Sequence, residues 1–117
     1  MTSEATLQAA IRAEAPRHGV YLWRNNSGVL QDGRGVPVRF GLGNDSSRLN
    51  AVLKSSDLIG IAPSGRFVAI EVKKAGWRGP RTDRERAQAA FINLVRKQGG
   101  IAAFVTTIEE FIECLKS

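Results

Sequence analysis

The sequence predicts one domain of the α/β class, spanning 1–117, in which a mixed β-sheet is flanked by helices on both sides. Three patterns lead to this expectation: a hairpin of two apolar strands over 57–73, a capped helical segment over 82–98, and a continuous apolar run at 101–105. A hairpin followed by a helix and a further strand implies a right-handed crossover within one mixed sheet. With the flanking elements, the expected order is helix, strand, strand, strand, helix, strand, helix.

The first helix is expected to begin at Thr2 or Ser3, because either hydroxyl can cap the free amides of the first turn. Its apolar positions follow a helical period, and Pro16 ends it. Glu4 lies three residues before Leu7, which places it on the buried stripe rather than on the solvent side. An acid in the first turn also stabilises the helix dipole, so this simpler role for Glu4 stays open.

A first strand is expected at 20–23, and it leads into the polar segment 24–28. The letters Asn-Asn-Ser-Gly within that segment are typical of a turn, although such side chains are also neutral donors that suit a phosphate backbone. From 29 to 56 the pattern is weak. We expect a loop or hairpin there, mobile without a ligand, with a short edge strand at 36–40.

The centre of the chain predicts an antiparallel hairpin, with strands over 57–62 and 67–73 joined by a turn at 63–66. Because side chains alternate along a strand, Glu71 and Lys73 point to one face and the apolar residues between and before them point to the other. Charged groups avoid buried strands unless they are paired or bound to a metal. This hairpin is therefore expected to contain the functional residues.

Asp57 opens the first strand of this hairpin, so two carboxylates and an ammonium converge at one sheet edge. Hard divalent cations take oxygen ligands and keep several waters, so one or two carboxylates are sufficient. The set favours a cation held beside a phosphate, and hence metal-dependent phosphodiester hydrolysis. The alternative is a structural ion-pair cluster. Zinc chemistry lacks ligands, since the single His18 stands at a turn and is expected on the surface.

The last third of the chain predicts a helix, a strand and a helix. Thr82 with Glu85 forms a capping box for the first of these helices, which ends before a pair of glycines. The apolar run at 101–105 is typical of a strand covered on both faces. Thr107 with Glu110 forms a second capping box, which opens the last helix.

The net charge of +6 favours polyanionic partners. Six cations stand against two acids over 73–86, a local excess of four; the cations are Lys73, Lys74, Arg78, Arg81, Arg84 and Arg86. Trp77 stands among glycines and a proline there, which indicates a flexible arm with an aromatic side chain and suits nucleic acid. A solvated basic loop is the alternative.

The lone Cys114 excludes an internal disulfide and is expected to fill the core. The start of the chain has no basic-then-apolar signal region, and no apolar run approaches the roughly 18–20 residues of a membrane span. We therefore expect a soluble, intracellular, cytoplasmic protein without a membrane partner.

Asp57, thirteen intervening residues and then Glu71, Val72 and Lys73 match the motif of the PD-(D/E)XK nuclease superfamily. The proline of that name is absent, because Ser56 precedes Asp57. Four further features accompany the motif: an acid on the leading helix, the polar segment after the first strand, the Ser-Asp-Leu-Ile-Gly opening of the hairpin, and a later helix that carries Gln and ends in Gly-Gly. Together these resemble the VRR-Nuc family over nearly the whole chain.

The resemblance implies a restriction-endonuclease-like fold and a set of metal ligands. Asp57 and Glu71 would bind Mg²⁺ or Mn²⁺, and the backbone carbonyl of Val72 would complete the protein's share. Glu4 matches the acid of the leading helix, which is a ligand directly or through water.

The resemblance also implies the catalytic residues, which comprise the two acidic ligands Asp57 and Glu71 with Lys73 and Gln88. Lys73 would position or deprotonate the attacking water and stabilise the developing charge. Gln88 would orient the lysine or the water.

Stand-alone members of the family, viral or bacterial, look like homodimeric nucleases that cleave four-way (Holliday) DNA junctions, so branched DNA and a second copy are the expected partners and a phage origin is open. The side chains expected on DNA are Arg24, Asn25, Asn26, Lys74, Trp77, Arg78, Arg81 and Arg84. Two alternatives remain: a non-catalytic nucleic-acid-binding module on the same fold, and an RNA-processing nuclease.

Overall fold

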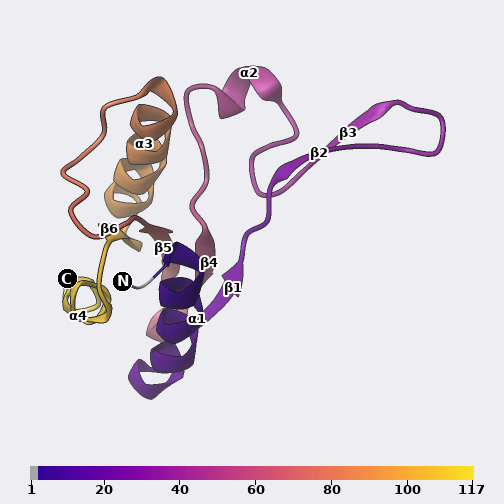
Figure 1. Ribbon diagram of the computed structural model, residues 1–117. Helices are drawn as coiled ribbons and strands as arrows, with labels where there is room; N and C mark the ends of the chain where they lie inside the picture. Colours follow the sequence, from indigo (N-terminus) through magenta and orange to yellow (C-terminus); the bar gives the residue numbers. More distant parts are fainter. Residues whose placement is uncertain (1–2) are drawn as a thin grey trace.

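The computed structural model describes residues 3–117, which form a four-stranded sheet with helices on both faces and a smaller two-stranded sheet (Figure 1). The main sheet has the order β1 (Tyr21–Arg24), β4 (Leu58–Ile61), β5 (Phe67–Val72) and β6 (Ile101–Val105). β4 is antiparallel to both β1 and β5, whereas β5 and β6 are parallel. The expected mixed sheet of the α/β class is confirmed.

The helices divide between the two faces of the main sheet. On one face, α1 (Glu4–Glu14) and α4 (Ile108–Cys114) pack against alternate side chains of β5, such as Ile70. On the other face, α3 (Asp83–Lys97) covers β5 and β6 through a second cluster that includes Ala69. β5 is therefore buried from both sides over most of its length, whereas β4 alternates between buried and more exposed residues.

The start of α1 agrees with the sequence. Ser3 is the N-cap, and its hydroxyl accepts a hydrogen bond from the amide of Thr6 over 3.1 Å. The alternative cap, Thr2, lies outside the described residues. After α1 the chain tightens into the 3₁₀ turn η1 (Ala15–His18), and His18 pairs with an acid one turn earlier on the surface, as expected.

The two later helices begin at the expected threonines. Thr82 accepts from the amide of Glu85 over 3.1 Å, and Thr107 accepts from the amide of Glu110 over 3.0 Å. Cys114 lies half-buried against the core, and burial raises the pKa of its thiol to about 11. The thiol therefore stays protonated at neutral pH and fills space, as expected.

The segment with the weak sequence signal contains an ordered hairpin. Strands β2 (Gly28–Gln31) and β3 (Pro37–Phe40) pair only with each other among the described residues, and they extend away from the main sheet (Figure 1). A short helix, α2 (Ser47–Asn50), follows, and the sequence did not predict it. The turn between β4 and β5 is the 3₁₀ turn η2 (Pro63–Gly65).

Among residues 3–117, no helix combines the length and the apolar character that crossing a bilayer requires.

Candidate functional site

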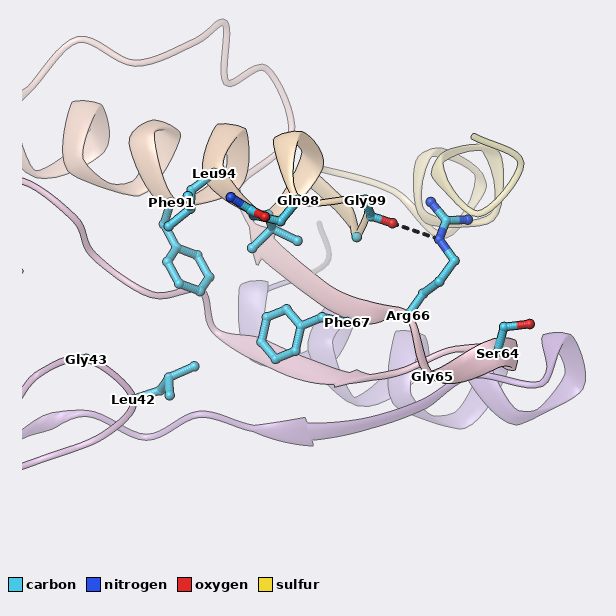
Figure 2. Close-up of a pocket in the computed structure, with 12 residues that line it drawn as sticks. Leu42, Gly43, Ser64, Gly65, Arg66, Phe67, Phe91, Leu94, Gln98 and Gly99 are labelled. Carbon is cyan, nitrogen blue, oxygen red and sulfur yellow. Dashed lines mark hydrogen bonds between the residues drawn. The ribbon is translucent and has the colours of Figure 1, made fainter.

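A cavity of about 730 Å³ lies away from the site that the sequence indicates. Figure 2 shows it between the end of α3, the turn before β5 and Leu42. Phe67 and Phe91 meet edge to face in its wall, with ring centroids 6.5 Å apart, and Arg66 donates to the carbonyl of Gly99 over 2.9 Å. Its lining in the described chain is mostly apolar and includes no carboxylate, so it does not provide ligands for a divalent cation.

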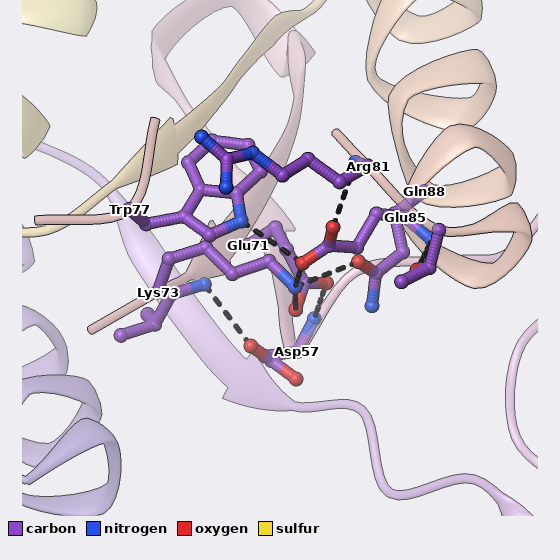
Figure 3. Close-up of polar contacts among 9 residues, drawn as sticks. Asp57, Glu71, Lys73, Trp77, Arg81, Glu85 and Gln88 are labelled. Atoms are coloured by element: carbon purple, nitrogen blue, oxygen red, sulfur yellow. Dashed lines mark hydrogen bonds and ion pairs between the residues drawn. The ribbon is translucent and has the colours of Figure 1, made fainter. Parts of the chain in front are cut away.

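The two predicted acids meet at the end of the β4–β5 hairpin. The register pairs Leu58 with Ile70, so Asp57, one residue earlier, stands beside Glu71. The amide of Asp57 donates to Glu71 Oε1 over 3.2 Å, and the amide of Val72 donates to Asp57 Oδ2 over 3.0 Å (Figure 3). Each carboxylate is thus held by the backbone of the opposite strand.

The pairing perturbs Glu71. Its side chain is buried, with 3% of the residue exposed, and burial together with the adjacent Asp57 carboxyl raises the pKa of Glu71 to about 9. Lys73 opposes this rise but does not cancel it. Two carboxyls that share one site cannot both ionise without a compensating cation. The pair therefore fits a hard divalent cation, whose oxygen ligands it supplies and whose charge would stabilise both anions.

Glu4 does not join the two acids in a metal-binding group. Within residues 3–117, no three side chains among His, Cys, Asp and Glu are gathered as ligands. Glu4 is half-buried in the first turn of α1, which packs on the face of the sheet opposite Glu71. Gln8, one turn further on, does line a cavity with Asp57, so the first half of α1 borders the site. The role of Glu4 as a ligand stays a prediction.

Lys73 and Gln88 are in contact, as the family pattern implies. Lys73 Nζ donates to Gln88 Oε1 over 2.8 Å and lies 4.0 Å from Glu71 Oε2 (Figure 3). Both side chains are shielded from water, since 13% of the Lys73 side chain and 4% of Gln88 are exposed. The predicted alternation along β5 is confirmed: Glu71 and Lys73 share a face, and Val72 belongs to the core on the other.

Glu85 is a site residue that the sequence reasoning missed. We expected a helix-capping role, yet its carboxylate lies 3.7 Å from Lys73 Nζ. It also accepts from the amide of Arg81 and from the indole of Trp77, each over 2.9 Å, and these two hydrogen bonds are the main reasons that its pKa is lowered. The available signal was its position three residues before Gln88, which places both on one helix face.

Trp77 is anchored rather than free in a flexible arm. Its ring stacks on Phe104 of β6 with a centroid separation of 4.6 Å and an interplanar angle of 31°. Lys73 Nζ lies 5.6 Å from the Trp77 ring. One ring face is therefore already covered within the protein. The cationic groups of Lys74, Arg78 and Arg81 belong to exposed residues on the same segment.

Several predicted DNA-binding residues surround Asp57. Arg24, Asn26 and Arg84 line one cavity of about 290 Å³ with it. Lys54, which the sequence reasoning also missed, lies near this group: burial and then the neighbouring cations Arg84 and Arg39 lower its pKa. The half-exposed Asp57 thus opens into a basic surrounding that suits a phosphate.

Asn25 lines the same cavity, but its side-chain amide is bonded within the protein. Its amide nitrogen donates to Ser55 Oγ over 2.7 Å and to the carbonyl of Ser56 over 2.9 Å. Its amide oxygen accepts from the amide of Leu42 over 3.1 Å. Because these bonds tie the end of β1 to the segment before β4, the Asn25 amide is not free for a phosphate. The sequence alone does not distinguish it from Asn26.

Comparisons with known proteins add no family: no protein-family model matches the chain, and no curated protein matches it significantly.

Proposed function

We propose that this protein is a divalent-metal-dependent DNA endonuclease that hydrolyses phosphodiester bonds. The observation that carries the proposal is the paired carboxyls of Asp57 and Glu71, with Lys73 and Gln88 alongside. A buried acid whose pKa is raised to about 9 by burial and a second acid is typical of a functional site. With the motif spacing, this supports a restriction-endonuclease-like domain of the stand-alone VRR-Nuc type.

Asp57 and Glu71 would hold the metal ion. The backbone carbonyl of Val72 and, directly or through water, Glu4 would complete the protein's ligands. Mg²⁺ or Mn²⁺ suits this all-oxygen set. When bound, such an ion activates water and offsets charge on the phosphoryl oxygens. Glu71 would give up its proton to a bound ion, since burial and the adjacent Asp57 raise the pKa of its carboxyl to about 9.

Lys73 would act beside the two acids. One N–H of its ammonium is used on Gln88 Oε1, and the others are available to the scissile phosphate or the attacking water. Because its side chain is largely shielded, its charge interacts with a phosphate more strongly than an exposed ammonium would. Gln88 orients the ammonium, and the ammonium stabilises the negative charge that builds up as water attacks.

DNA would be held through its phosphates. Arg24 and Arg84 border the cavity at Asp57, while Arg78 and Arg81 extend the basic surface along the segment before α3. Contacts of this kind fix the position of the duplex and read no bases. Selectivity would then follow the shape of the DNA, and four-way junctions are the proposed substrate.

Resolving a junction needs two cuts on opposed strands, whereas this small domain holds one candidate site. A two-fold homodimer with an isologous interface would supply both. Light scattering on the purified protein tests this part: a mass of two chains is expected, and a mass of one chain at working concentrations would limit the enzyme to single nicks.

A non-catalytic nucleic-acid-binding module is the second candidate. The basic surround of Asp57 favours it as much as it favours the nuclease. An ionised carboxylate at the point where phosphates dock would weaken a pure binder, since it repels the ligand. Cleavage separates the two candidates.

The test is incubation of the protein with labelled linear, flapped and four-way DNA, and with RNA of matched sequence, in Mg²⁺, Mn²⁺ or EDTA. We expect cuts in DNA with either metal, strongest on the four-way substrate, and none in EDTA. Asp57→Asn is the matched control, because it keeps the size of the side chain and removes its charge.

Three outcomes would contradict the proposal. Equal cleavage by Asp57→Asn would remove Asp57 from the site. DNA binding without cleavage in any metal would support the binding module. Cleavage restricted to RNA would support an RNA-processing nuclease.

A further inference from the structure

The acid of α3 that contacts Lys73 also holds both ends of a basic segment. We name residues 74–82 the basic arm. Glu85 Oε2 accepts from the indole Nε1 of Trp77 near its start, and Glu85 Oε1 accepts from the amide of Arg81 near its end (Figure 3). The amide of Glu85 in turn donates to Thr82 Oγ1. One side chain thus closes the arm into a loop.

The aromatic end of the arm is fixed independently of Glu85. Trp77 stacks on Phe104, which belongs to the buried parallel strand β6. The loop therefore rests on the sheet rather than hanging from α3. Arg78 and Arg81 line a cavity of about 390 Å³ with Trp77 and Glu85, so the arm presents its cations from a fixed frame.

The same carboxylate is part of the surroundings of Lys73. Lys73 Nζ has Gln88 Oε1 at 2.8 Å, Glu85 Oε2 at 3.7 Å and Glu71 Oε2 at 4.0 Å. A carboxylate that binds a metal ion has less negative charge left to interact with the Lys73 ammonium. If Glu71 held a metal ion, Glu85 would be the nearby carboxylate that remains to balance the charge of Lys73.

We propose that Glu85 is a positioning residue that joins the basic arm to Lys73, so that the frame presenting Arg78 and Arg81 to a phosphate also sets the place of the catalytic ammonium. This inference rests on the proposed nuclease function and adds to it a residue outside the family motif. Glu85 acts through Lys73 and Trp77 and does not itself touch the reacting phosphate.

Glu85→Gln tests the proposal with little change in shape. The two donors bind different oxygens of Glu85, and an amide has only one oxygen, so with the side chain in its present place the variant loses its bond to either Trp77 or Arg81. Asp83→Asn is the matched control: it removes the same charge from the first turn of α3, but the Asp83 side chain is 96% exposed and pairs with Arg86 rather than with Lys73, Trp77 or the Arg81 amide.

For Glu85→Gln we expect kcat on cleavable DNA to fall about tenfold or more, as for other partners that orient a reacting group. The Kd for DNA in EDTA should change much less, and Asp83→Asn should keep both constants. Trp77→Phe removes the indole donor and keeps a ring on Phe104, so it should lower kcat in the same direction. It also tests the link if Glu85→Gln does not fold.

A spectroscopic readout follows the arm without cleavage. The chain has two tryptophans, so in a Trp23→Phe background the emission comes from Trp77 alone. Glu85→Gln should make this emission more accessible to acrylamide, and Asp83→Asn should leave it unchanged.

The outcomes separate this inference from the proposed function. A wild-type protein that cleaves no nucleic acid overturns the proposed function. If the wild type cleaves, and Glu85→Gln keeps its kcat within about twofold or leaves Trp77 emission unchanged, the joining role of Glu85 is wrong and the nuclease proposal stands.

Discussion

The two β-hairpins of this protein differ in what covers them. The β4–β5 hairpin lies in the middle of the main sheet, with α1 and α4 on one face and α3 on the other. The β2–β3 hairpin stands apart (Figure 1), and it leaves apolar side chains such as Val29, Leu30 and Val38 exposed. The first hairpin ends in Asp57 and Glu71, whereas the second carries no pair of acids among its described strands.

This difference indicates which hairpin can hold functional side chains in fixed positions. Carboxylates of a metal site must be held within a fraction of an ångström, and packing on both faces provides this at the end of β4–β5. A two-stranded hairpin is only marginally stable without a covered face. The base of β2–β3 is fixed instead by Asn44, whose buried amide donates to the carbonyls of Gly28 and Phe40.

The largest expected effect is at the covered hairpin. Lys73→Ala should reduce cleavage by about a thousandfold, because it removes the charge that stabilises the transition state. DNA binding and folding should change little. The measurement is single-turnover cleavage of the preferred DNA, with the exposed Lys116→Ala as a control for loss of one positive charge. Near-normal turnover by Lys73→Ala would show that the ammonium has no catalytic role.

At the projecting hairpin, Asn44→Ala should loosen β2–β3 while the main sheet stays intact. The substitution removes the side-chain hydrogen bonds to the carbonyls of Gly28 and Phe40 and one of the two bonds from Arg39, at a cost of about 0.5–1.5 kcal/mol per bond. Amide hydrogen exchange should become faster over 28–40 and stay slow in β5. Equal acceleration in both hairpins would mean that the two are not independent.

The pH dependence of stability sharpens the comparison, because it reports on Glu71 alone. The pKa of Glu71 is about 9 in the fold, against 4.5 for an unperturbed glutamate, so its proton stabilises the fold at low pH. This contribution is lost as the pH rises through the folded pKa. In EDTA, Glu71→Gln should therefore gain Tm relative to the wild type as the pH rises from 5 to 9. A difference that is independent of pH would contradict the raised pKa.

The smallest effect is expected on the basic arm. Neutralising Arg78 or Arg81 should weaken DNA binding modestly and reduce the slope of log K against log salt by about one phosphate each. The exposed Arg17→Ala, in η1 after the end of α1, should not change the slope. If the arm variants also left it unchanged, the arm would not contact the DNA backbone.

The sequence predicted the covered hairpin well because its signals were local. Alternation along β5 assigned Glu71 and Lys73 to one face, and the capping threonines marked the starts of α3 and α4. For β2–β3 it predicted only a loop or hairpin with one short strand at 36–40, because that hairpin has no buried face and its apolar residues follow no period of two. The short helix α2 had no pattern of its own.

The site was predicted in part, and what was missed depends on tertiary contacts. Asp57, Glu71 and Lys73 lie at the end of one hairpin, so their spacing in the sequence was enough to predict that they meet. Glu85 looked like a capping acid, and its contact with Lys73 exists only because α3 packs over the end of β5. Lys54 likewise gained its cationic neighbours through the fold.

The central claim is that the carboxyls of Asp57 and Glu71 bind one metal site together. Its most direct test is titration calorimetry of Mn²⁺ into the wild type, Asp57→Asn and Glu71→Gln at neutral pH, in two buffers of different ionisation heat. We expect binding by the wild type with release of a proton, since Glu71 must ionise, and strongly weakened binding by both variants. Equal Mn²⁺ affinity in all three proteins, or no binding by the wild type, would contradict the account.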